Sequence, residues 1–262
     1  MLKVLSIGNS FSQDAHAYLH TMSECDGPGI NTKINTVNLY IGGCSLKTHW
    51  ENAQSGEKCY QREENGVGGG ETVSLSEGLS SEAWDIVTFQ QASHDSGLPE
   101  TYFPYLRLLL DYAGARAPQA AKMLHETWAY ETDSAHEMFY RYGRDQQAMY
   151  LALKAAYGEA SARLGLPLIP CGDVIQALRG EKPFDYENGG VSLCRDGFHL
   201  SCVYGRYAAA ATWYETLAGG LSANGFLPPE ADPALVELIK RAVVRTCATE
   251  TKNSKTSTAK NT

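Results

Sequence analysis

A serine follows the first apolar run of the chain, at a position where its hydroxyl could act as a nucleophile. Residues 4–7 (VLSI) lead directly into residues 8–12 (GNSFS), and a helix-compatible segment follows over residues 14–22. A strand, a tight turn and a helix in this order place the turn at the carboxyl edge of a sheet. There Ser10 is a nucleophile if a base reaches it. Because serine is also a favoured helix N-cap, a purely structural role for Ser10 stays open on this stretch alone.

The base that fits best is His199, which follows Asp196 by three residues in the stretch DGFHLS. At this spacing, in a turn that opens a helix, the carboxylate can bend back to Nδ1 of the imidazole and leave Nε2 free for Ser10. An isolated D-x-x-H is also compatible with a plain turn followed by a surface histidine. His16 and His20 are alternative bases, but their spacing near the first helix favours the core or the solvent.

Developing negative charge on a carbonyl oxygen needs hydrogen-bond donors aimed at it. The N–H of Ser10 can supply one, and Gly42-Gly43 after the second predicted strand can supply another, because glycine leaves the backbone free to turn its N–H groups toward a ligand. Gln90-Gln91 after the third predicted strand offers side-chain amides. Two glycines also fit an ordinary turn, and a glutamine at a strand end also fits a structural tie to a loop.

These residues lie on elements that alternate between strand and helix. We predict strands at residues 4–7, 33–41, 84–89, 121–127 and 166–169, and helices at residues 14–22, 45–52, 102–115, 145–164, 173–178, 204–217 and 233–248. This alternation predicts an α/β fold, a three-layer α/β/α sandwich with a mostly parallel, about five-stranded sheet. Ligands of such sheets bind at the carboxyl ends of the strands, which gathers Ser10, Gly42-Gly43, Gln90-Gln91 and the aromatic residues Trp128 and Tyr130 at one edge.

The length of 262 residues favours one sizeable domain over residues 1–248, followed by a polar tail over residues 249–262 that we expect to be disordered. Residues 53–80 are polar and rich in glycine, and we interpret them as an excursion from the sheet with a short hairpin around residues 71–75. The turn-forming residues 26–29 (DGPG) separate the first helix from the second strand.

The charge and the hydropathy exclude several function classes. A formal net charge of −8 argues against a nucleic-acid partner, because phosphate binding needs clustered Lys and Arg. No apolar run approaches the length of a membrane span, so no membrane partner is expected. Oligomeric state is not indicated by the sequence.

Seven cysteines are scattered without a C-x-x-C pair or a matching histidine spacing, which argues against a zinc site. In a chain of this length they favour buried reduced thiols over a disulfide framework. With no signal-peptide pattern before the first strand, we expect a cytoplasmic protein, or a secreted or periplasmic one if a signal has been removed.

The chain resembles the SGNH/GDSL hydrolase superfamily in five stretches: IGNSFSQDA, LYIGGCSL, WDIVTFQQAS, TWAY and DGFHLS. Within that superfamily it resembles a subgroup known only as a domain of unknown function and related to carbohydrate esterases. The resemblance extends over residues 2–218. It implies a flavodoxin-like fold, with Ser10 as nucleophile, His199 as base, Asp196 as its orienting carboxylate, and the N–H groups of Ser10 and of Gly42 or Gly43 in the oxyanion hole.

The chain departs from the family pattern at two places. The usual Gly-Asp-Ser is Gly-Asn-Ser here, and the usual G-x-N-D block is absent. Relatives that act on acetylated sugars carry Gln-Gly-Glu at the corresponding place, which matches residues 91–93. We therefore predict Gln91 as the third oxyanion donor, with Gln90 and His94 as alternatives.

The resulting hypothesis is a cofactor-independent serine esterase that removes a small acyl group, favoured to be acetyl, from a carbohydrate. Trp128, Tyr130 and Trp50 are predicted to form the substrate wall with His94, since aromatic faces suit sugar rings, although core packing explains aromatic residues equally well. Two alternatives remain. One is a catalytically impaired carbohydrate-binding protein on the same scaffold, and the other is a hydrolase of lipid or thioester substrates.

Overall fold

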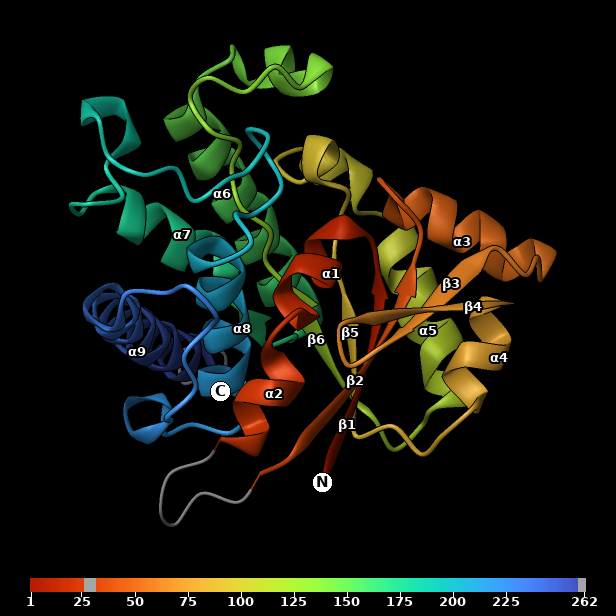
Figure 1. Cartoon of the computed structure of the whole chain (residues 1–262). Helices are drawn as coiled ribbons and strands as arrows, with labels where there is room; N and C mark the ends of the chain where they lie inside the picture. Colours follow the sequence, from red (N-terminus) through yellow and green to blue (C-terminus); the bar gives the residue numbers. More distant parts are fainter. Residues whose placement is uncertain (26–31, 259–262) are drawn as a thin grey trace.

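A seven-stranded sheet forms the centre of the molecule, which a computed structural model describes over residues 1–25 and 32–258 (Figure 1). The strand order is β4-β3-β2-β1-β5-β6-β7. The four neighbouring pairs β2–β1, β1–β5, β5–β6 and β6–β7 are parallel. The strands are β1 (Leu2–Gly8), β2 (Ile34–Tyr40), β3 (Tyr60–Glu64), β4 (Val67–Val73), β5 (Ile86–Phe89), β6 (Ala121–His125) and β7 (Leu168–Ile169).

Helices cover both faces of this sheet, which confirms the predicted α/β sandwich. One face carries α1 (Ser10–His16), α2 (Leu19–Glu24), α7 (Cys171–Arg179), α8 (Tyr204–Leu217) and α9 (Pro233–Thr258) (Figure 1). The other carries α3 (Leu46–Ser55), α4 (Leu75–Ser80), α5 (Tyr105–Arg116) and part of α6 (Gln146–Leu164). Short 3-10 helices occupy Ser93–Asp95, Pro99–Thr101, Glu137–Tyr142, Tyr186–Asn188 and Leu221–Ala223.

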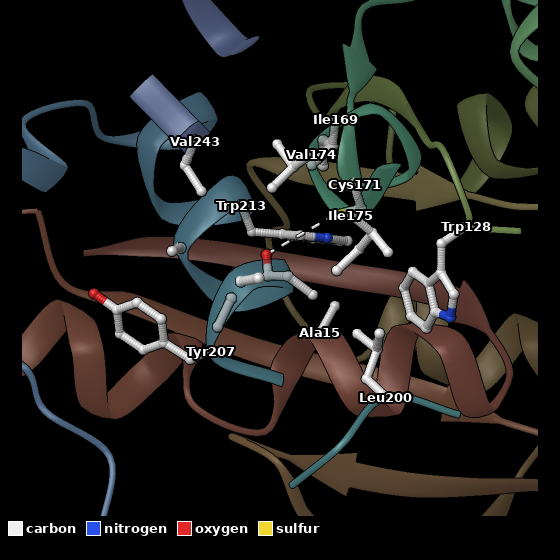
Figure 2. Close-up of a cluster of buried hydrophobic side chains, with 14 of the residues drawn as sticks. Ala15, Trp128, Ile169, Cys171, Val174, Ile175, Leu200, Tyr207, Trp213 and Val243 are labelled. Carbon is white, nitrogen blue, oxygen red and sulfur yellow. Dashed lines mark hydrogen bonds between the residues drawn. The ribbon is translucent and has the colours of Figure 1, made fainter. Parts of the chain in front are cut away.

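The two apolar cores explain why β1 is an almost continuous apolar run. Successive side chains of a strand point to opposite faces, so Val4 packs into the core under α8 while Leu5 and Ile7 pack into the core under α5. Figure 2 shows the first of these cores, in which Trp213 of α8 lies near Val174 and Cys171 of α7. The buried alanines of α8 let that helix approach the sheet closely.

The prediction that residues 53–80 leave the sheet is wrong. After the end of α3 they form a hairpin, β3 and β4, that extends the sheet at its edge beside β2, and then the short helix α4. The hairpin turns at Asn65-Gly66, where both residues have positive φ, and not around residues 71–75. The sheet therefore has two more strands than the predicted five, because the polar strand β3 and the glycine-rich strand β4 lack the apolar alternation that reveals a strand in a sequence.

The ends of two predicted helices also differ from the prediction. The segment 14–22 is divided into α1 and α2, and α1 begins at Ser10. The last helix, α9, extends to Thr258 and so includes most of the tail that we predicted to be disordered. The predicted turn at residues 26–29 and the last four residues lie outside the described residues.

The seven cysteines are all free thiols, but the prediction that they are buried holds only for Cys44, Cys171 and Cys194, whereas Cys25 and Cys202 are exposed. Over the part of the chain that the structure describes, no helix has the length and apolarity needed to cross a membrane.

Candidate active site

Ser10 lies at the carboxyl end of β1 as the first residue of α1. The residue that caps α1 is Asn9, whose Oδ1 accepts the N–H of Phe11 at 3.0 Å, while the Asn9 N–H donates to Oγ of Ser12 at 3.0 Å. The alternative role of Ser10 as the helix cap is therefore wrong. The side chain of Ser10 is half-buried and forms no hydrogen bond within the described part of the chain. Its hydroxyl is therefore available to react.

Gly8 makes this turn possible. A Cβ atom at Gly8 would lie 2.0 Å from Oγ of Ser12 and 2.4 Å from Oδ1 of Asn38. Those two atoms hydrogen-bond to each other at 2.8 Å, and Asn38 in turn donates to Glu63 at 2.8 Å. The nucleophile turn is thus seated on a buried polar network that only glycine at position 8 accommodates.

Asp196 and His199 form the hydrogen bond that their spacing predicts. Oδ2 of Asp196 lies 2.7 Å from Nδ1 of His199, and the backbone N–H of His199 donates to Oδ1 at 2.8 Å. Partial burial by itself would raise the pKa of Asp196, but the hydrogen bonds from the His199 ring and from the backbone N–H groups of His199 and Phe198 outweigh it and lower the pKa. The carboxylate stays ionised, fixes Nδ1 as the donor, and leaves Nε2 as the acceptor.

Asp14, which we did not single out from the sequence, connects this pair to the helix of Ser10. Its buried carboxylate accepts the backbone N–H of Leu200, the residue after His199, at 2.8 Å. The same carboxylate pairs with Arg195 at 3.0 Å and with Arg206 at 2.8 Å. The segment that carries Asp196 and His199 is thus held against α1. An acid one helical turn after the candidate nucleophile is the signal that could have revealed it.

The ring contacts place His199 beside the nucleophile turn. Its imidazole centroid lies 6.2 Å from the ring of Phe11, the residue that follows Ser10. Phe11 itself stacks on Trp128 at 4.2 Å, and Nε1 of Trp128 donates to the backbone oxygen of Phe198 at 2.8 Å. The rings of Phe11 and Trp128 therefore contact the segment that carries His199.

Gly42 and Gly43 lie in an exposed turn after β2, next to the nucleophile turn. Nδ2 of Asn9 donates to the backbone oxygen of Cys44 at 3.2 Å and so ties the two turns together. Within the described residues the N–H groups of Gly42 and Gly43 have no hydrogen-bond partner. The N–H of Ser10 likewise has no partner inside its helix, because the first residues of a helix leave their N–H groups free.

The side chain of Gln91 does not fit the role we predicted for it. Its Nε2 donates to both the backbone oxygen and Oγ1 of Thr101, at 3.1 and 2.9 Å, and its Oε1 accepts the N–H groups of Leu46 and Ala92 at 2.9 Å. Both amide hydrogens are therefore used by the neighbouring loop. Gln91 is a structural tie, which is the alternative that a glutamine at a strand end left open.

Gln90 supports the nucleophile turn from within the protein. Its Nε2 donates to Oδ1 of Asn9 at 2.5 Å, and its Oε1 lies 2.7 Å from Nδ1 of His125. Burial lowers the pKa of His125 to about 3, with a smaller contribution from His16, so the ring is neutral and donates to Gln90. The buried series His125, Gln90 and Asn9 fixes the orientation of the cap just before Ser10.

The predicted substrate wall is largely wrong. Trp128 and Tyr130 have exposed fractions of 0%, and the Tyr130 hydroxyl hydrogen-bonds to Ser93 at 2.9 Å. Trp50 lies on α3, where it makes an edge contact with Tyr112 of α5 on the face of the sheet that α1 does not cover. Aromatic type alone did not distinguish these core residues from ligand contacts.

The rings that lie near His199 are those of Phe198 and His136. Phe198 lies 4.2 Å from the His199 ring and 4.8 Å from that of His136, and all three are half-buried. His94, which we predicted near the substrate, stacks on His136 at 6.3 Å. Burial, His94 and His199 lower the pKa of His136, only partly offset by Glu137 and Asp196. Phe198 was within the D-G-F-H stretch, but nothing in the sequence pointed to His136.

The alternative bases are placed elsewhere. His16 is fully buried, lies 3.0 Å from Oγ of Ser6 on β1, and has its pKa lowered by burial to about 3. Nδ1 of His20 lies 2.9 Å from the backbone oxygen of Ile34 on β2. Among the described residues no cluster of His, Cys, Asp and Glu is suited to hold a metal ion.

This arrangement can be compared with known families. The model of a family described as "Domain of unknown function (DUF4886)" matches residues 3–247. The chain belongs to the DUF4886 family. A solved structure of a DUF4886 family protein from Bacteroides uniformis is 33% identical, with 93% of each chain covered and a TM-score of 0.84. None of the curated proteins matches the chain.

More distant solved structures share the fold of this DUF4886 chain. A proposed SGNH hydrolase from Slackia heliotrinireducens is 22% identical over 84% of this chain and 99% of that one, with a TM-score of 0.54. A proposed GDSL-like lipase from Parabacteroides merdae is 16% identical over 84% of this chain and 96% of that one, with a TM-score of 0.52. The predicted resemblance to the SGNH/GDSL superfamily is thus confirmed for the fold.

Proposed function

We propose that the chain is a serine ester hydrolase in which Ser10, His199 and Asp196 act as nucleophile, base and orienting carboxylate. The observation that carries this proposal is the 2.7 Å hydrogen bond between Asp196 and Nδ1 of His199, in a segment that Asp14 holds against the helix beginning at Ser10. It leaves Nε2 of a ring that lies beside the nucleophile turn free to accept a proton.

In the proposed reaction the Ser10 oxygen attacks the ester carbonyl while Nε2 of His199 takes the hydroxyl proton. The imidazolium, stabilised by Asp196, then returns that proton to the leaving alcohol as the C–O bond breaks, which leaves an acyl group on Ser10. Water attacks this acyl group with His199 again as base, and the carboxylic acid departs as Ser10 regains its proton.

The N–H groups of Ser10 and of Gly42 or Gly43 are the proposed oxyanion donors. They are uncommitted, they belong to two turns joined by the hydrogen bond from Asn9 to Cys44, and Gly43 adopts a φ of +63° that favours glycine. Donors of this kind stabilise the tetrahedral intermediate by roughly 3 kcal/mol each. The third donor predicted from the sequence, Gln91, has no hydrogen left to give.

The substrate we propose is an ester with a small acyl group, favoured to be acetyl, on a carbohydrate. The sequence resemblance to carbohydrate esterases supports it, and the half-buried rings of Phe198 and His136 beside His199 offer both an aromatic face and a polar edge to a sugar. Neither Trp128 nor Tyr130 takes part in this surface, because both are buried.

One observation favours the second candidate, carbohydrate binding without hydrolysis. The Ser10 hydroxyl forms no hydrogen bond within the described part of the chain, and therefore none with His199. Catalytic hydrogen bonds are often long in the absence of substrate, so the esterase remains the better supported function.

The test compares the wild-type chain with Ser10→Ala and Asp196→Asn on p-nitrophenyl acetate and on acetylated xylose. We expect each variant to lose at least about a thousandfold in kcat/KM and Ser10→Ala to escape labelling by a fluorophosphonate. The matched control is Ser80→Ala at the exposed end of α4, which should retain full activity.

Two results would contradict the esterase. Undiminished turnover by Ser10→Ala would exclude Ser10 as the nucleophile. A wild-type chain that binds acetylated xylose but releases no acetate, and takes no fluorophosphonate, would establish the second candidate. Faster turnover of p-nitrophenyl palmitate than of the acetate would favour a lipid substrate instead.

A further inference from the structure

His136 lies near the proposed base and presents one ring nitrogen to solvent. It is the N-cap of the 3-10 helix Glu137–Tyr142, where its Nδ1 accepts the backbone N–H of Met138 at 3.2 Å. Its Nε2 forms no hydrogen bond with any residue that the structure describes. Unlike the unpartnered ring nitrogens of the buried histidines, this atom is accessible, so a ligand can meet it.

The hydrogen bond from Met138 determines which ring nitrogen of His136 carries the proton. An imidazole nitrogen that accepts a hydrogen bond is unprotonated, so the proton of the neutral ring lies on Nε2. Burial lowers the pKa of His136, with smaller contributions in the same direction from His94 and His199, so the ring is neutral at pH 7. Nε2–H of His136 is therefore an uncommitted hydrogen-bond donor.

Three neighbouring rings hold this donor in place. The imidazole of His136 lies 4.6 Å from the ring of Tyr130 and 4.8 Å from that of Phe198, and it stacks on His94 at 6.3 Å. The Tyr130 ring is itself fixed, since its hydroxyl hydrogen-bonds to Ser93 at 2.9 Å. A donor that is already oriented before the ligand arrives loses little conformational entropy on binding.

The position of His136 indicates which part of an ester it would meet. In the proposed reaction Nε2 of His199 returns its proton to the oxygen of the leaving alcohol, so the alcohol lies on the His199 side of Ser10. The acyl oxygen points instead to the proposed oxyanion donors. Phe198 contacts both the His199 ring, at 4.2 Å, and the His136 ring, which places His136 beside the alcohol part of the ester.

The charges near the ring favour a neutral acceptor. Glu137 and Asp196 both lie close enough to His136 to raise its pKa, although burial outweighs them. The cation of the same 3-10 helix, Arg141, is paired with Asp95. The two carboxylates would repel an acidic sugar, whereas a hydroxyl oxygen of a neutral sugar accepts the hydrogen bond without this repulsion.

We propose that His136 is a substrate-binding residue whose Nε2–H donates to a hydroxyl oxygen in the alcohol part of the ester. The inference rests on the proposed reaction at Ser10. It names the contact by which the esterase prefers the ester of a neutral sugar to the ester of an alcohol that has no other hydroxyl group.

The test replaces the two ring nitrogens of His136 separately. His136→Asn keeps an amide oxygen near the position of Nδ1 and can still accept the Met138 N–H, because asparagine is a favoured N-cap, but it has no donor at the position of Nε2. His136→Gln places an amide nitrogen near that position and restores the donor. Steady-state kinetics are measured on acetylated xylose and on phenyl acetate, whose alcohol part has no hydroxyl group.

On acetylated xylose we expect His136→Asn to raise KM about tenfold and to change kcat less than about twofold, because the lost hydrogen bond binds ground state and transition state alike. His136→Gln should recover a KM within about threefold of the wild type. Both variants should hydrolyse phenyl acetate as the wild type does. His20→Asn, at the amino end of β2, is the matched control and should change neither reaction.

Calorimetry of acetylated xylose with Ser10→Ala, with and without His136→Asn, measures the same contact without hydrolysis. A wild-type chain that hydrolyses neither ester would contradict the proposed function, and a roughly tenfold higher Kd in the double variant would still support the contact. Circular dichroism establishes that the variants are folded.

Four results would overturn the role of His136. These are no binding of acetylated xylose by Ser10→Ala, wild-type KM and Kd in His136→Asn, an equal loss on both esters, and no recovery in His136→Gln. An equal loss on both esters would indicate that His136 serves only as the cap of its helix.

Discussion

Asp14 accepts the backbone N–H of Leu200 at 2.8 Å, across 186 positions of sequence. Asp14 follows Ser10 by one turn of α1, and Leu200 follows His199 directly. Together with the packing of Phe11 and Trp128 described above, this bond positions the proposed base relative to the proposed nucleophile. Arg195 and Arg206 neutralise the carboxylate that makes it.

We expect Asp14→Asn to lower both stability and activity. The amide would leave Arg195 and Arg206 without a counter-charge, at a cost of about 2–4 kcal/mol in the free energy of unfolding, reduced from the fully buried case because both arginines reach solvent. Because His199 would also lose its position, kcat should fall at least about tenfold while KM changes less. Urea denaturation and steady-state kinetics measure the two effects.

Asp111→Asn, on the exposed side of α5, is the control for the same chemical change. It should alter neither the free energy of unfolding nor kcat. If Asp14→Asn retained wild-type kcat at a temperature where it is folded, the bond to Leu200 would have no part in positioning His199.

Gln90→Met should reduce turnover without removing any proposed catalytic group. The thioether fills the space of the amide but cannot donate to Asn9 or accept from His125, so the cap before Ser10 loses its orientation. We expect kcat to fall about tenfold, because the Ser10 N–H and hydroxyl are then less well aligned. Steady-state kinetics with p-nitrophenyl acetate measure this fall in kcat.

The neighbouring Gln91→Met is the matched control. It removes the ties to Thr101 and Leu46 and should lower the free energy of unfolding by about 1–3 kcal/mol, while the folded protein keeps its kcat. A larger loss of kcat in Gln91→Met than in Gln90→Met would restore Gln91 as an oxyanion donor.

The buried pair of Arg179 and Glu131 should couple strongly. The two side chains are 4% and 2% exposed, and they meet at 3.6 Å beneath the segment of His199. Arg179→Met leaves Glu131 as an unpaired buried charge and should cost about 3–5 kcal/mol, whereas Arg179→Met combined with Glu131→Leu should cost less than the sum of the single changes. Denaturant unfolding of the four proteins gives the coupling, and strict additivity would contradict it.

Stability should decrease as the pH falls from about 6.5 toward 3. Burial lowers the pKa of His16, His49 and His125 to about 3 in the folded protein, whereas unfolded histidine titrates near 6.5. Between these values the unfolded chain binds more protons, so each ring contributes up to about 1.4 kcal/mol of lost stability per pH unit.

Urea denaturation at pH 7.5, 6.5 and 5.5 measures this slope, above the range in which most carboxylates titrate. His49→Phe, which keeps the stack on Tyr60, should reduce the slope by about a third, whereas His20→Gln at a half-buried position serves as the comparison. Equal stability at pH 7.5 and 5.5 would show that the buried rings do not resist protonation.

Local features of this site could be predicted from the sequence because their partners are near in the chain. The turn at Ser10 follows from an apolar run that ends in glycine, and the bond from Asp196 to His199 spans three residues. Both depend on backbone geometry that a few consecutive residues determine. The parallel sheet follows in the same way from alternating elements, except at β3 and β4, where the charged and polar residues of β3 and the glycines of β4 conceal the strand pattern.

Tertiary structure alone decided which polar and aromatic groups face the site. Gln90 and Gln91 are adjacent and chemically identical, yet one supports Asn9 and the other binds Thr101. Likewise Trp128 is buried while Phe198 reaches the surface. The physical reason is that a side chain's role depends on which distant partner satisfies its hydrogen bonds or covers its surface, and those partners meet only when the chain has folded.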